Sequence, residues 1–377
     1  MNPSGIKKYR GFYTVGGLMF LSKSAAYYYS LQTQQPITWY FHNHIWDKFY
    51  STKKDNLGHA NLDLLYKKRA QQLRDSYDYL ILHYSGGADS HNVLQTFISA
   101  GIHIDEVFVR RHDRVESKLY TPDPTNTSPE NILSEYDFAQ FPTLRYLAIN
   151  HPKIKLTTCE VFDENPEKLI NDDAFLTMPH TMSLMDNFRQ GARSPNEKRL
   201  KDKGLKIANI FGNDKPIVYT KGNDCYMTFT DSGLSAGLGL ENVEAFYWTA
   251  DMPELPFEQA FAVFEHFKKD KTNRWTIDIN EFGSLQRQSS DLRENIMKSV
   301  LYKTTWDFKT FQTSKGLLPY KGPYIIPARD VLYLENPFFQ KLHERWLYHY
   351  QNWNVKNLSL PTLGWHHNKR YLLGSFD

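Results

Sequence analysis

A short run of small and polar residues, HYSGGADSHN at positions 83–92, follows an apolar segment and has the composition of an anion-binding loop. Two consecutive glycines, Gly86 and Gly87, let the backbone turn tightly, and the absence of a Cβ lets a phosphate approach the main chain closely. The N–H groups of such a loop and of the helix after it converge where the helix dipole favours negative charge. The segment therefore predicts a phosphate site.

Three side chains of the loop refine this prediction. Ser85 and Ser90 add hydroxyl donors for a phosphate. Asp89 would repel a phosphate unless a divalent cation lies between them, as Mg²⁺ commonly does. No Lys stands at the Walker A position and no GxGxxG is present, so the loop is neither a P-loop nor a Rossmann fingerprint.

The segments around this loop alternate between apolar strands and amphipathic helices. The run DYLILHY is almost continuously apolar, which is typical of a strand buried on both faces of a parallel sheet. Strand and helix alternating at this spacing predict a parallel α/β sheet with right-handed crossovers. We expect strands at residues 78–84, 104–111, 154–162 and 205–211, and helices at 63–77, from about 89 to Gly101, and at 135–151.

The chain divides into three parts. Residues 1–58 predict a small α+β unit, with two short strands around a Gly-Gly turn, a helix capped by Ser22 and a further strand. Residues 59–250 hold the alternating strands and helices together with the loop. Residues 251–377 predict an aromatic-rich, mainly helical region for a substrate or partner, and core packing is the alternative role of its aromatic side chains.

The residues Ser85-Gly86-Gly87-Ala88-Asp89-Ser90 match SGGxDS, and the chain here resembles the PP-loop ATP pyrophosphatases. Relatives include asparagine, GMP and NAD synthetases, tRNA-lysidine synthetase, tRNA thiolases and, more distantly, PAPS reductase. The resemblance implies a doubly wound parallel sheet of the adenine nucleotide alpha hydrolase-like type, in which residues 59–250 bind ATP with Mg²⁺. It also implies that the loop holds the pyrophosphate and that the α-phosphorus is transferred as AMP onto a substrate oxygen.

A second resemblance covers most of the chain. The order of YTVGGLMFLSK, ITWYFHN, SGGADSHN, FGNDKP, FYWTADMPEL and TTWDFKTFQTSK is similar to that in PP-loop proteins of tailed bacteriophages that are labelled asparagine-synthase-like or PAPS-reductase-like. This resemblance brings no settled activity with it. It implies a location in the host cytoplasm, and it makes a modified nucleobase or nucleotide an attractive substrate.

The sequence differs from those of the better-known relatives in ways that restrict the reactions it could catalyse. Glutamine-dependent asparagine synthetases carry a nucleophilic Cys where Asn2 stands here, and no glutaminase domain is present, so the nitrogen donor would be ammonia or an amine. PAPS reductases carry a C-terminal catalytic Cys, and no cysteine follows Cys225. Thiolases use paired or relay cysteines, which Cys159 and Cys225 do not obviously supply. Sulfur chemistry is therefore disfavoured.

A second candidate segment, FGNDKP at residues 211–216, also follows an apolar strand. In a parallel sheet the carboxyl ends of both strands lie at one edge. Asp214 would then share Mg²⁺ with Asp89, and Lys215 would offset charge on the departing pyrophosphate. The alternative is a plain β-turn, because Gly, Asn and Asp favour turns in any case.

Other candidates lie outside these two segments. Arg110 and Arg111 end the second expected strand, where the family generally places adenosine contacts, and a solvated strand end is the alternative. Lys309 and Lys315 are further candidate phosphate or substrate ligands, although exposed loop lysines are commoner than functional ones.

The sequence argues against a metal site built from Cys and His. There are 2 cysteines and no CxxC, which excludes a cysteine-rich zinc site and a disulfide framework. Cys225 lies in an expected hairpin and would simply be packed. The pair His366-His367 has no nearby partner in the sequence, and such histidines are usually surface residues.

The overall composition excludes few binding partners or locations. The chain has 45 basic and 42 acidic residues, so its charge does not call for nucleic acid or an anionic membrane, although the basic stretch 186–204 leaves a nucleic-acid contact open. No apolar run approaches the roughly 20 residues that span a bilayer. The segment MNPSGIKKYRG lacks the apolar core of a secretory signal. We expect a cytoplasmic protein, and its oligomeric state is left open.

Together these features predict an AMP-forming, ligase-like ATP pyrophosphatase. A carboxylate, carbonyl or amide oxygen would attack the α-phosphorus, pyrophosphate would leave, and an amine or ammonia would displace AMP, which requires positioning and charge stabilisation more than a protein nucleophile. Two alternatives stay open: a PAPS-reductase-like nucleotide-binding protein with other chemistry, and a non-catalytic nucleotide sensor or host-interaction protein. The presence of both Asp89 and Asp214 favours catalysis.

Overall fold

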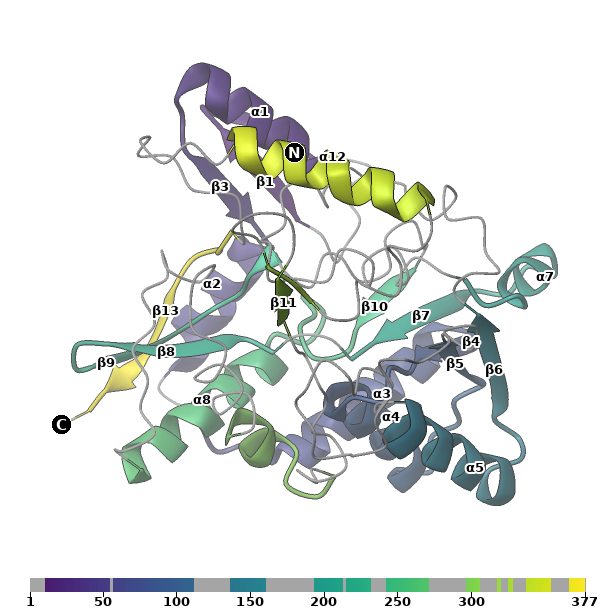
Figure 1. Cartoon of the computed structure of the whole chain (residues 1–377). Helices are drawn as coiled ribbons and strands as arrows, with labels where there is room; N and C mark the ends of the chain where they lie inside the picture. Colours follow the sequence, from purple (N-terminus) through teal and green to yellow (C-terminus); the bar gives the residue numbers. More distant parts are fainter. Residues whose placement is uncertain are drawn as a thin grey trace.

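A five-stranded sheet forms the centre of the fold (Figure 1). The computed structural model describes residues 11–54, 57–111, 136–160, 193–212, 215–231, 242–270, 296–305, 317–319, 325–327, 337–353 and 366–376. The order of the strands is β10-β7-β4-β5-β6, and every neighbouring pair is parallel. The strands are β4 (Tyr79–His83), β5 (Glu106–Arg111), β6 (Lys155–Glu160), β7 (Ile207–Phe211) and β10 (Val243–Ala245). The predicted parallel α/β sheet is confirmed, with β10 as a strand that the sequence did not indicate.

The direction in which strands are added to this sheet reverses at β4. From β4 the chain proceeds through β5 to β6 at one edge, returns to β7 on the other side of β4, and continues to β10 at the opposite edge. In open α/β sheets a ligand crevice forms outside the carboxyl ends of the strands at such a switch point. Here the switch point lies between β4 and β7, which precede the glycine loop and the FGNDKP segment.

Helix α3 begins at a capped residue and is anchored to the sheet by a buried ion pair. The Asn61 side chain accepts hydrogen bonds from the backbone N–H groups of Asp63 and Leu64. Arg69 of this helix is buried, and its guanidinium lies 2.7 Å from the carboxylate of Glu244 in β10. The helices around the sheet are α3 (Leu62–Ser76), α4 (Ala88–Ser99), α5 (Phe141–Asn150, preceded by a π-helical turn at Tyr136–Gln140), α7 (Glu197–Asp202) and α8 (Glu254–Lys269).

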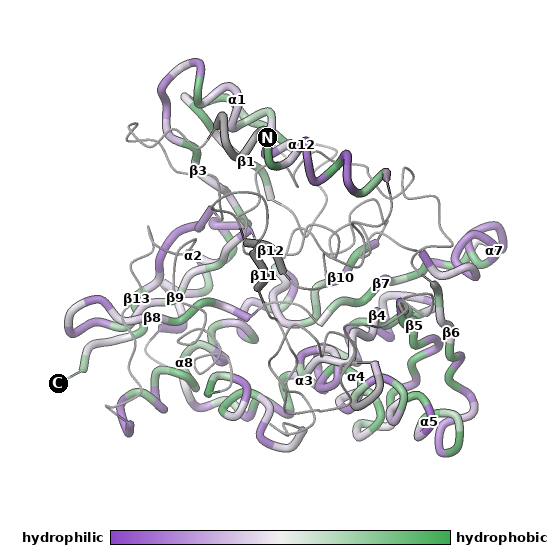
Figure 2. Tube along the Cα trace, viewed as in Figure 1, coloured by the Kyte–Doolittle hydropathy of each residue, from purple (hydrophilic) through white to green (hydrophobic). Residues whose placement is uncertain are grey.

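Helix α4, which follows the loop, has the apolar face that its sequence predicts. Val93, Leu94 and Phe97 are fully buried. The helix ends before Gly101, whose φ of +66° and whose N–H bond to the Ile98 carbonyl (3.0 Å) close the last turn. In Figure 2, β5 and β7 are drawn largely as hydrophobic and α7 as largely hydrophilic, so the apolar residues gather on the central sheet.

Three smaller antiparallel sheets complete the described fold, with strand orders β2-β1-β3, β11-β12 and β13-β9-β8. As predicted, Ser22 caps the first helix, because its hydroxyl accepts a bond from Ala25 N (3.3 Å). None of the helices in the described part of the chain is long and apolar enough to cross a bilayer. The remaining elements are β1 (Phe12–Val15), β2 (Leu18–Phe20), α1 (Lys23–Thr33), β3 (Ile37–Tyr40), α2 (Asn43–Lys53), β8 (Ile217–Lys221), β9 (Asp224–Thr228), β11 (Leu317–Pro319), β12 (Ile325–Pro327), α12 (Pro337–Trp353) and β13 (Tyr371–Ser375).

Candidate functional site

The glycine loop connects the carboxyl end of β4 to the first turn of α4. Gly86 has a φ of +85°, a conformation that residues with a Cβ rarely adopt. Gly87 is the N-cap residue of α4, in an extended conformation with φ −76° and ψ 161°, and brings no capping side chain. The N-terminus of α4 therefore faces the loop in the way that an anion site requires.

Two serines hold the shape of this loop. The buried Ser90 hydroxyl donates to the Gly87 carbonyl (3.0 Å) and accepts from Ser85 N (3.2 Å). The Ser85 hydroxyl accepts from Gly87 N (3.2 Å), and the Ser85 carbonyl accepts from Gln140 Nε2 (2.7 Å). Ser85 is exposed, whereas Ser90 lies beneath the loop. Of the two predicted phosphate donors, Ser85 is the accessible one, and Ser90 supports the backbone.

The segment after β7 lies directly against the loop. A Cβ added to Gly212 would stand 2.9 Å from the Asp89 carbonyl oxygen and 3.0 Å from the Ser90 Cα, which are backbone atoms that cannot easily move. Glycine at this position therefore allows the two backbones to approach. The structure thus brings the described residues of this segment, Phe211, Gly212, Lys215 and Pro216, to the predicted edge of the sheet. Asp214 itself lies outside the described residues.

Asp89 Oδ1 receives two contacts from distant parts of the chain. Lys215 Nζ lies 3.0 Å from it, and the Tyr302 hydroxyl donates a hydrogen bond of 2.7 Å. The Lys215 side chain is 6% exposed and that of Asp89 is 28% exposed, so the pair is less screened by water than a surface pair. Lys215 thereby offsets the negative charge that Asp89 places at the helix N-terminus.

Three buried tyrosines surround this carboxylate. The ring centroid of Tyr247 lies 5.6 Å from that of Tyr302 and 5.7 Å from that of Tyr66. The Tyr247 hydroxyl donates to the Asp89 carbonyl oxygen (2.9 Å). Burial, and secondarily the charge of Asp89, raises the pKa of Tyr302 well above its ordinary value, and burial also raises the pKa of Tyr247 and Tyr66. The three hydroxyls therefore remain protonated donors at neutral pH.

Arg110, at the end of β5, turns inward. Its guanidinium donates to Nδ1 of His83 and lies 5.2 Å from the centroid of the Phe108 ring. Burial, and then the charge of Arg110, lowers the pKa of His83 well below its ordinary value. The neutral ring therefore carries its proton on Nε2, which donates to Asn209 Oδ1 (2.8 Å). Because Arg110 is buried, the alternative that it simply ends a solvated strand is wrong. Its contact with adenosine stays a prediction.

The remaining predicted residues lie away from the loop or outside the described part. Lys309 and Lys315 fall outside it, as does the side chain of Arg111. Cys225 is fully buried, as a packing role predicts. His366 is also buried, contrary to expectation, because residues 366–368 pair with the chain near Asp231; burial lowers the pKa of His366 to about 3.

Three contacts of the loop carried no signal in the sequence. Tyr302 and Tyr247 reach Asp89 from 213 and 158 positions away, and Gln140 reaches Ser85 from 55 positions away. A single tyrosine or glutamine has no spacing pattern that reveals such a partner. Only the repeated appearance of apolar strands followed by polar loops could have indicated which segments meet.

The described residues contain no cluster of three or more His, Cys, Asp or Glu side chains that could hold a metal by themselves. Mg²⁺ bound together with a nucleotide needs only one or two carboxylates, because phosphate oxygens and water complete its shell. Asp89 meets that requirement among the described residues. The donor set therefore fits a cation that arrives with a phosphate ligand.

Comparison with known protein families finds no family model that matches the chain, and comparison with curated proteins finds no match either.

Proposed function

We propose that the protein binds ATP at the switch point between β4 and β7 and transfers AMP to a substrate oxygen. The observation that carries this proposal is the 3.0 Å ion pair between Asp89 and Lys215, which joins the loop after β4 to the segment after β7. A triphosphate bound with a divalent cation requires a carboxylate for the cation and an ammonium for the phosphate. These two side chains supply both at one point.

The loop supports the same proposal. The glycines remove side chains from the path of a phosphate, and the helix N-terminus supplies backbone N–H donors. Ser85 adds an exposed hydroxyl, and Asp89, together with Asp214, would hold Mg²⁺. When bound, the metal would screen the phosphate charges. Arg110 and the neutral His83 lie at the carboxyl ends of β5 and β4, where an adenosine would be within reach of the guanidinium.

The proposed reaction needs no protein nucleophile. A carboxylate, carbonyl or amide oxygen of the substrate attacks the α-phosphorus of ATP, and the bond from that phosphorus to the bridging oxygen breaks to release pyrophosphate. Ammonia or an amine then attacks the activated carbon, and AMP leaves with the transferred oxygen. The chain positions the reactants, and Lys215 stabilises the charge on the departing pyrophosphate.

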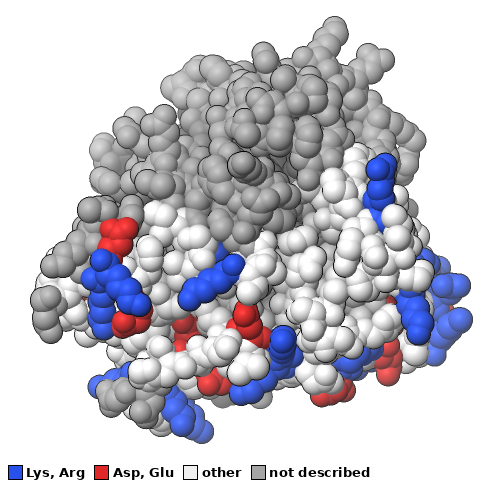
Figure 3. Space-filling model, turned by 90° about the horizontal axis from the view of Figure 1, so that it is seen from below, with Lys and Arg blue, Asp and Glu red and all other residues white. Residues whose placement is uncertain are grey.

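The charges on one described face argue against an extended nucleic acid as a ligand of that face. On the face shown in Figure 3, Lys and Arg are interspersed with Asp and Glu over the described residues. A long polyanion is normally bound by a patch of one charge sign. A small molecule or a nucleotide therefore fits this face better than an extended nucleic acid.

Product analysis tests the proposal directly. The protein is incubated with ATP, Mg²⁺ and ammonium in the presence of pools of carboxylates, nucleobases and nucleotides, and the nucleotides are separated by chromatography. Equal amounts of AMP and pyrophosphate, abolished in Asp89→Asn, would support adenylylation. Stoichiometric ADP and orthophosphate would contradict it, and ATP binding without turnover in any pool would indicate a nucleotide sensor.

A further inference from the structure

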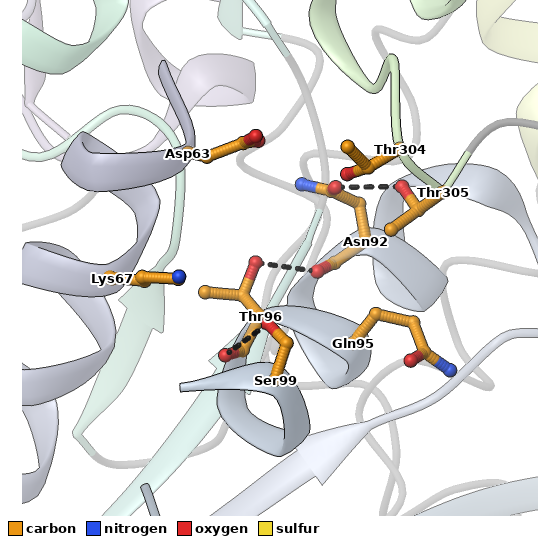
Figure 4. Close-up of a pocket in the computed structure, with 8 residues that line it drawn as sticks. All are labelled: Asp63, Lys67, Asn92, Gln95, Thr96, Ser99, Thr304 and Thr305. Carbon is orange, nitrogen blue, oxygen red and sulfur yellow. Dashed lines mark hydrogen bonds between the residues drawn. The ribbon is translucent and has the colours of Figure 1, made fainter. Parts of the chain in front are cut away.

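A separate polar cavity lies beside the loop, between α3, α4 and the short segment that follows Tyr302. Its volume is about 300 Å³, at the lower end of the range for small-molecule sites. Every lining residue has a polar side chain. The lining consists of Asp63 and Lys67 from α3, Asn92, Gln95, Thr96 and Ser99 from α4, and Thr304 and Thr305 (Figure 4).

The inner wall of the cavity is rigidly held. Asn92 is buried, its Oδ1 accepts from the Thr305 hydroxyl (2.8 Å), and its Nδ2 donates to the Tyr247 hydroxyl (3.0 Å). The Thr96 hydroxyl donates to the Asn92 carbonyl oxygen (2.8 Å). These bonds fix the inner polar groups before any ligand arrives, which lowers the entropic cost of binding.

The outer wall carries two opposite charges that do not pair with each other. Asp63 and Lys67 stand four positions apart on α3, in the order that favours an ion pair. Both side chains are exposed, and neither forms a hydrogen bond or an ion pair with another side chain of the described residues. Figure 4 shows both extending from α3 toward α4 and the cavity. The cavity thus presents one negative and one positive group about one helical turn apart.

We propose that this cavity binds a small zwitterion of the amino-acid class, with Asp63 contacting its ammonium and Lys67 its carboxylate. A polyanion would meet Asp63 beside the single ammonium of Lys67. A divalent cation that arrives without a phosphate ligand would find one carboxylate, and the Lys67 ammonium beside it would repel the cation. A neutral sugar would gain no ionic contact, because both exposed charges would stay solvated by water alone. A zwitterion satisfies both groups and keeps the site electrically neutral.

The cavity shares a wall with the loop but does not depend on a nucleotide. Asn92 lies one helical turn after Asp89, about 4.5 Å further along the axis. Thr305 belongs to the same short segment as Tyr302, which bonds to Asp89. Zwitterion binding can therefore be measured without ATP, and its outcome is independent of the proposed adenylylation.

Calorimetry on the full chain tests this inference. Each of the common amino acids is titrated into nucleotide-free protein, and the methyl ester and N-acetyl derivative of any that binds are titrated in parallel. We expect at least one free amino acid to bind, and both derivatives to bind at least about tenfold more weakly, since a bond to a charged group is lost. Glucose serves as the neutral polar probe.

Variants on the exposed face of α3 assign the two charges. Asp63→Asn should weaken the binding of the amino acid but should not further weaken the binding of its N-acetyl derivative. Lys67→Gln should likewise weaken the binding of the amino acid but should not further weaken the binding of its methyl ester. Lys68→Gln and Asp75→Asn change exposed charges of the same helix away from the cavity, and they should leave binding unchanged. The inference is overturned if no amino acid binds, if glucose binds as tightly, or if Asp63→Asn and Lys67→Gln act no more strongly than these controls.

Discussion

Asp89 and Lys215 stand 126 positions apart in the chain, yet the Lys215 ammonium lies 3.0 Å from the Asp89 carboxylate. The two residues meet because the strands before them, β4 and β7, are neighbours in a parallel sheet. The close approach of Gly212 to the Asp89 backbone holds the second segment in place. This arrangement leads to the following predictions.

The first prediction concerns the coupling within this ion pair. In a double-mutant cycle of Asp89→Asn, Lys215→Met and the double variant, the unfolding free energies should show a coupling of about 0.5–3 kcal/mol. The reason is that removal of either side chain leaves the other charge unpaired in a partly buried site. Urea denaturation provides the measurement. The exposed pair Glu265 and Lys268, at 2.7 Å, is the matched control and should couple by less than about 1 kcal/mol. Additive effects for Asp89 and Lys215 would contradict the pairing.

The second prediction concerns a shared Mg²⁺ site. Asp89→Asn and Asp214→Asn should each reduce turnover, and the double variant should lose much less than the product of the two losses, since both side chains act through one cation. Turnover should also stop on addition of a chelator and return with Mg²⁺. Asn forms a β-turn as well as Asp does. A fully active Asp214→Asn enzyme would therefore show that Asp214 only shapes a turn, and Asp89 would remain the only proposed metal ligand.

The third prediction concerns Gly87. Gly87→Leu should abolish ATP binding, measured by calorimetry, because the new side chain occupies the path of the phosphate. The backbone of Gly87 has negative φ, so the substitution should cost only the loss of a favoured N-cap residue, about 0.5–2 kcal/mol, and should leave the fold intact. Ala100→Leu adds similar bulk at the other end of α4 and should bind ATP normally. Unchanged ATP affinity in Gly87→Leu would contradict the proposal that this loop binds the phosphates of ATP.

The fourth prediction separates close contact from backbone strain. Gly212→Ala should cost about 1–3 kcal/mol of stability and should weaken ATP binding, because the Cβ pushes the Asp89 backbone away. Gly222→Ala is the counterpart: Gly222 has a φ of +61° and open space around the added Cβ. It should lose stability through strain alone and retain its ATP affinity. Equal effects of the two variants on ATP affinity would show that Gly212 has no special relation to the loop.

The fifth prediction concerns Tyr302. Tyr302→Phe removes a hydrogen bond to a carboxylate and should cost about 1–3 kcal/mol at neutral pH. Because the folded pKa of Tyr302 is raised above its ordinary value of about 10, its contribution is complete below that pH and is lost as the pH rises further. The unfolding free energy should therefore fall above about pH 10, and in the variant it should fall less steeply by about 1.4 kcal/mol per pH unit. Tyr28→Phe removes an exposed hydroxyl and should change the unfolding free energy at neutral pH by no more than about 0.5 kcal/mol.

The elements that could be predicted from the sequence are those with a local signal. The apolar run before Ser85, the two glycines and the apolar stripe of α4 each depend on neighbouring residues, and all appear as expected. Helix α2 was missed although Trp46, Phe49 and Tyr50 stand at helical spacing in its sequence and lie in or against the core. Strand β10 was missed because it is short and carries Glu244, whose charge is stabilised by the distant residues Arg69 and Tyr77.

The candidate site was predictable only in part, for the same reason. The positions of Gly212 and Lys215 follow from the rule that parallel strands end at one edge. The tyrosines around Asp89 follow from no such rule, because their contacts depend on how α3 and residues 296–305 pack. Burial of His366 likewise depends on its pairing with the chain near Asp231, which no pattern around the two histidines indicates.

The pairing of β13 with β9 sets the time at which one sheet can be completed during synthesis. Ser375 and Asp224 are 151 positions apart, and their strands lie side by side. At about 5–20 residues per second, a ribosome needs roughly 8–30 s to make the intervening chain. Throughout that interval β9, at one edge of the β8–β9 hairpin, has no partner strand on that side. The unpaired N–H and C=O groups of such an edge can pair with another chain. A nascent chain stalled before β13 would therefore be more prone to aggregation than the finished protein.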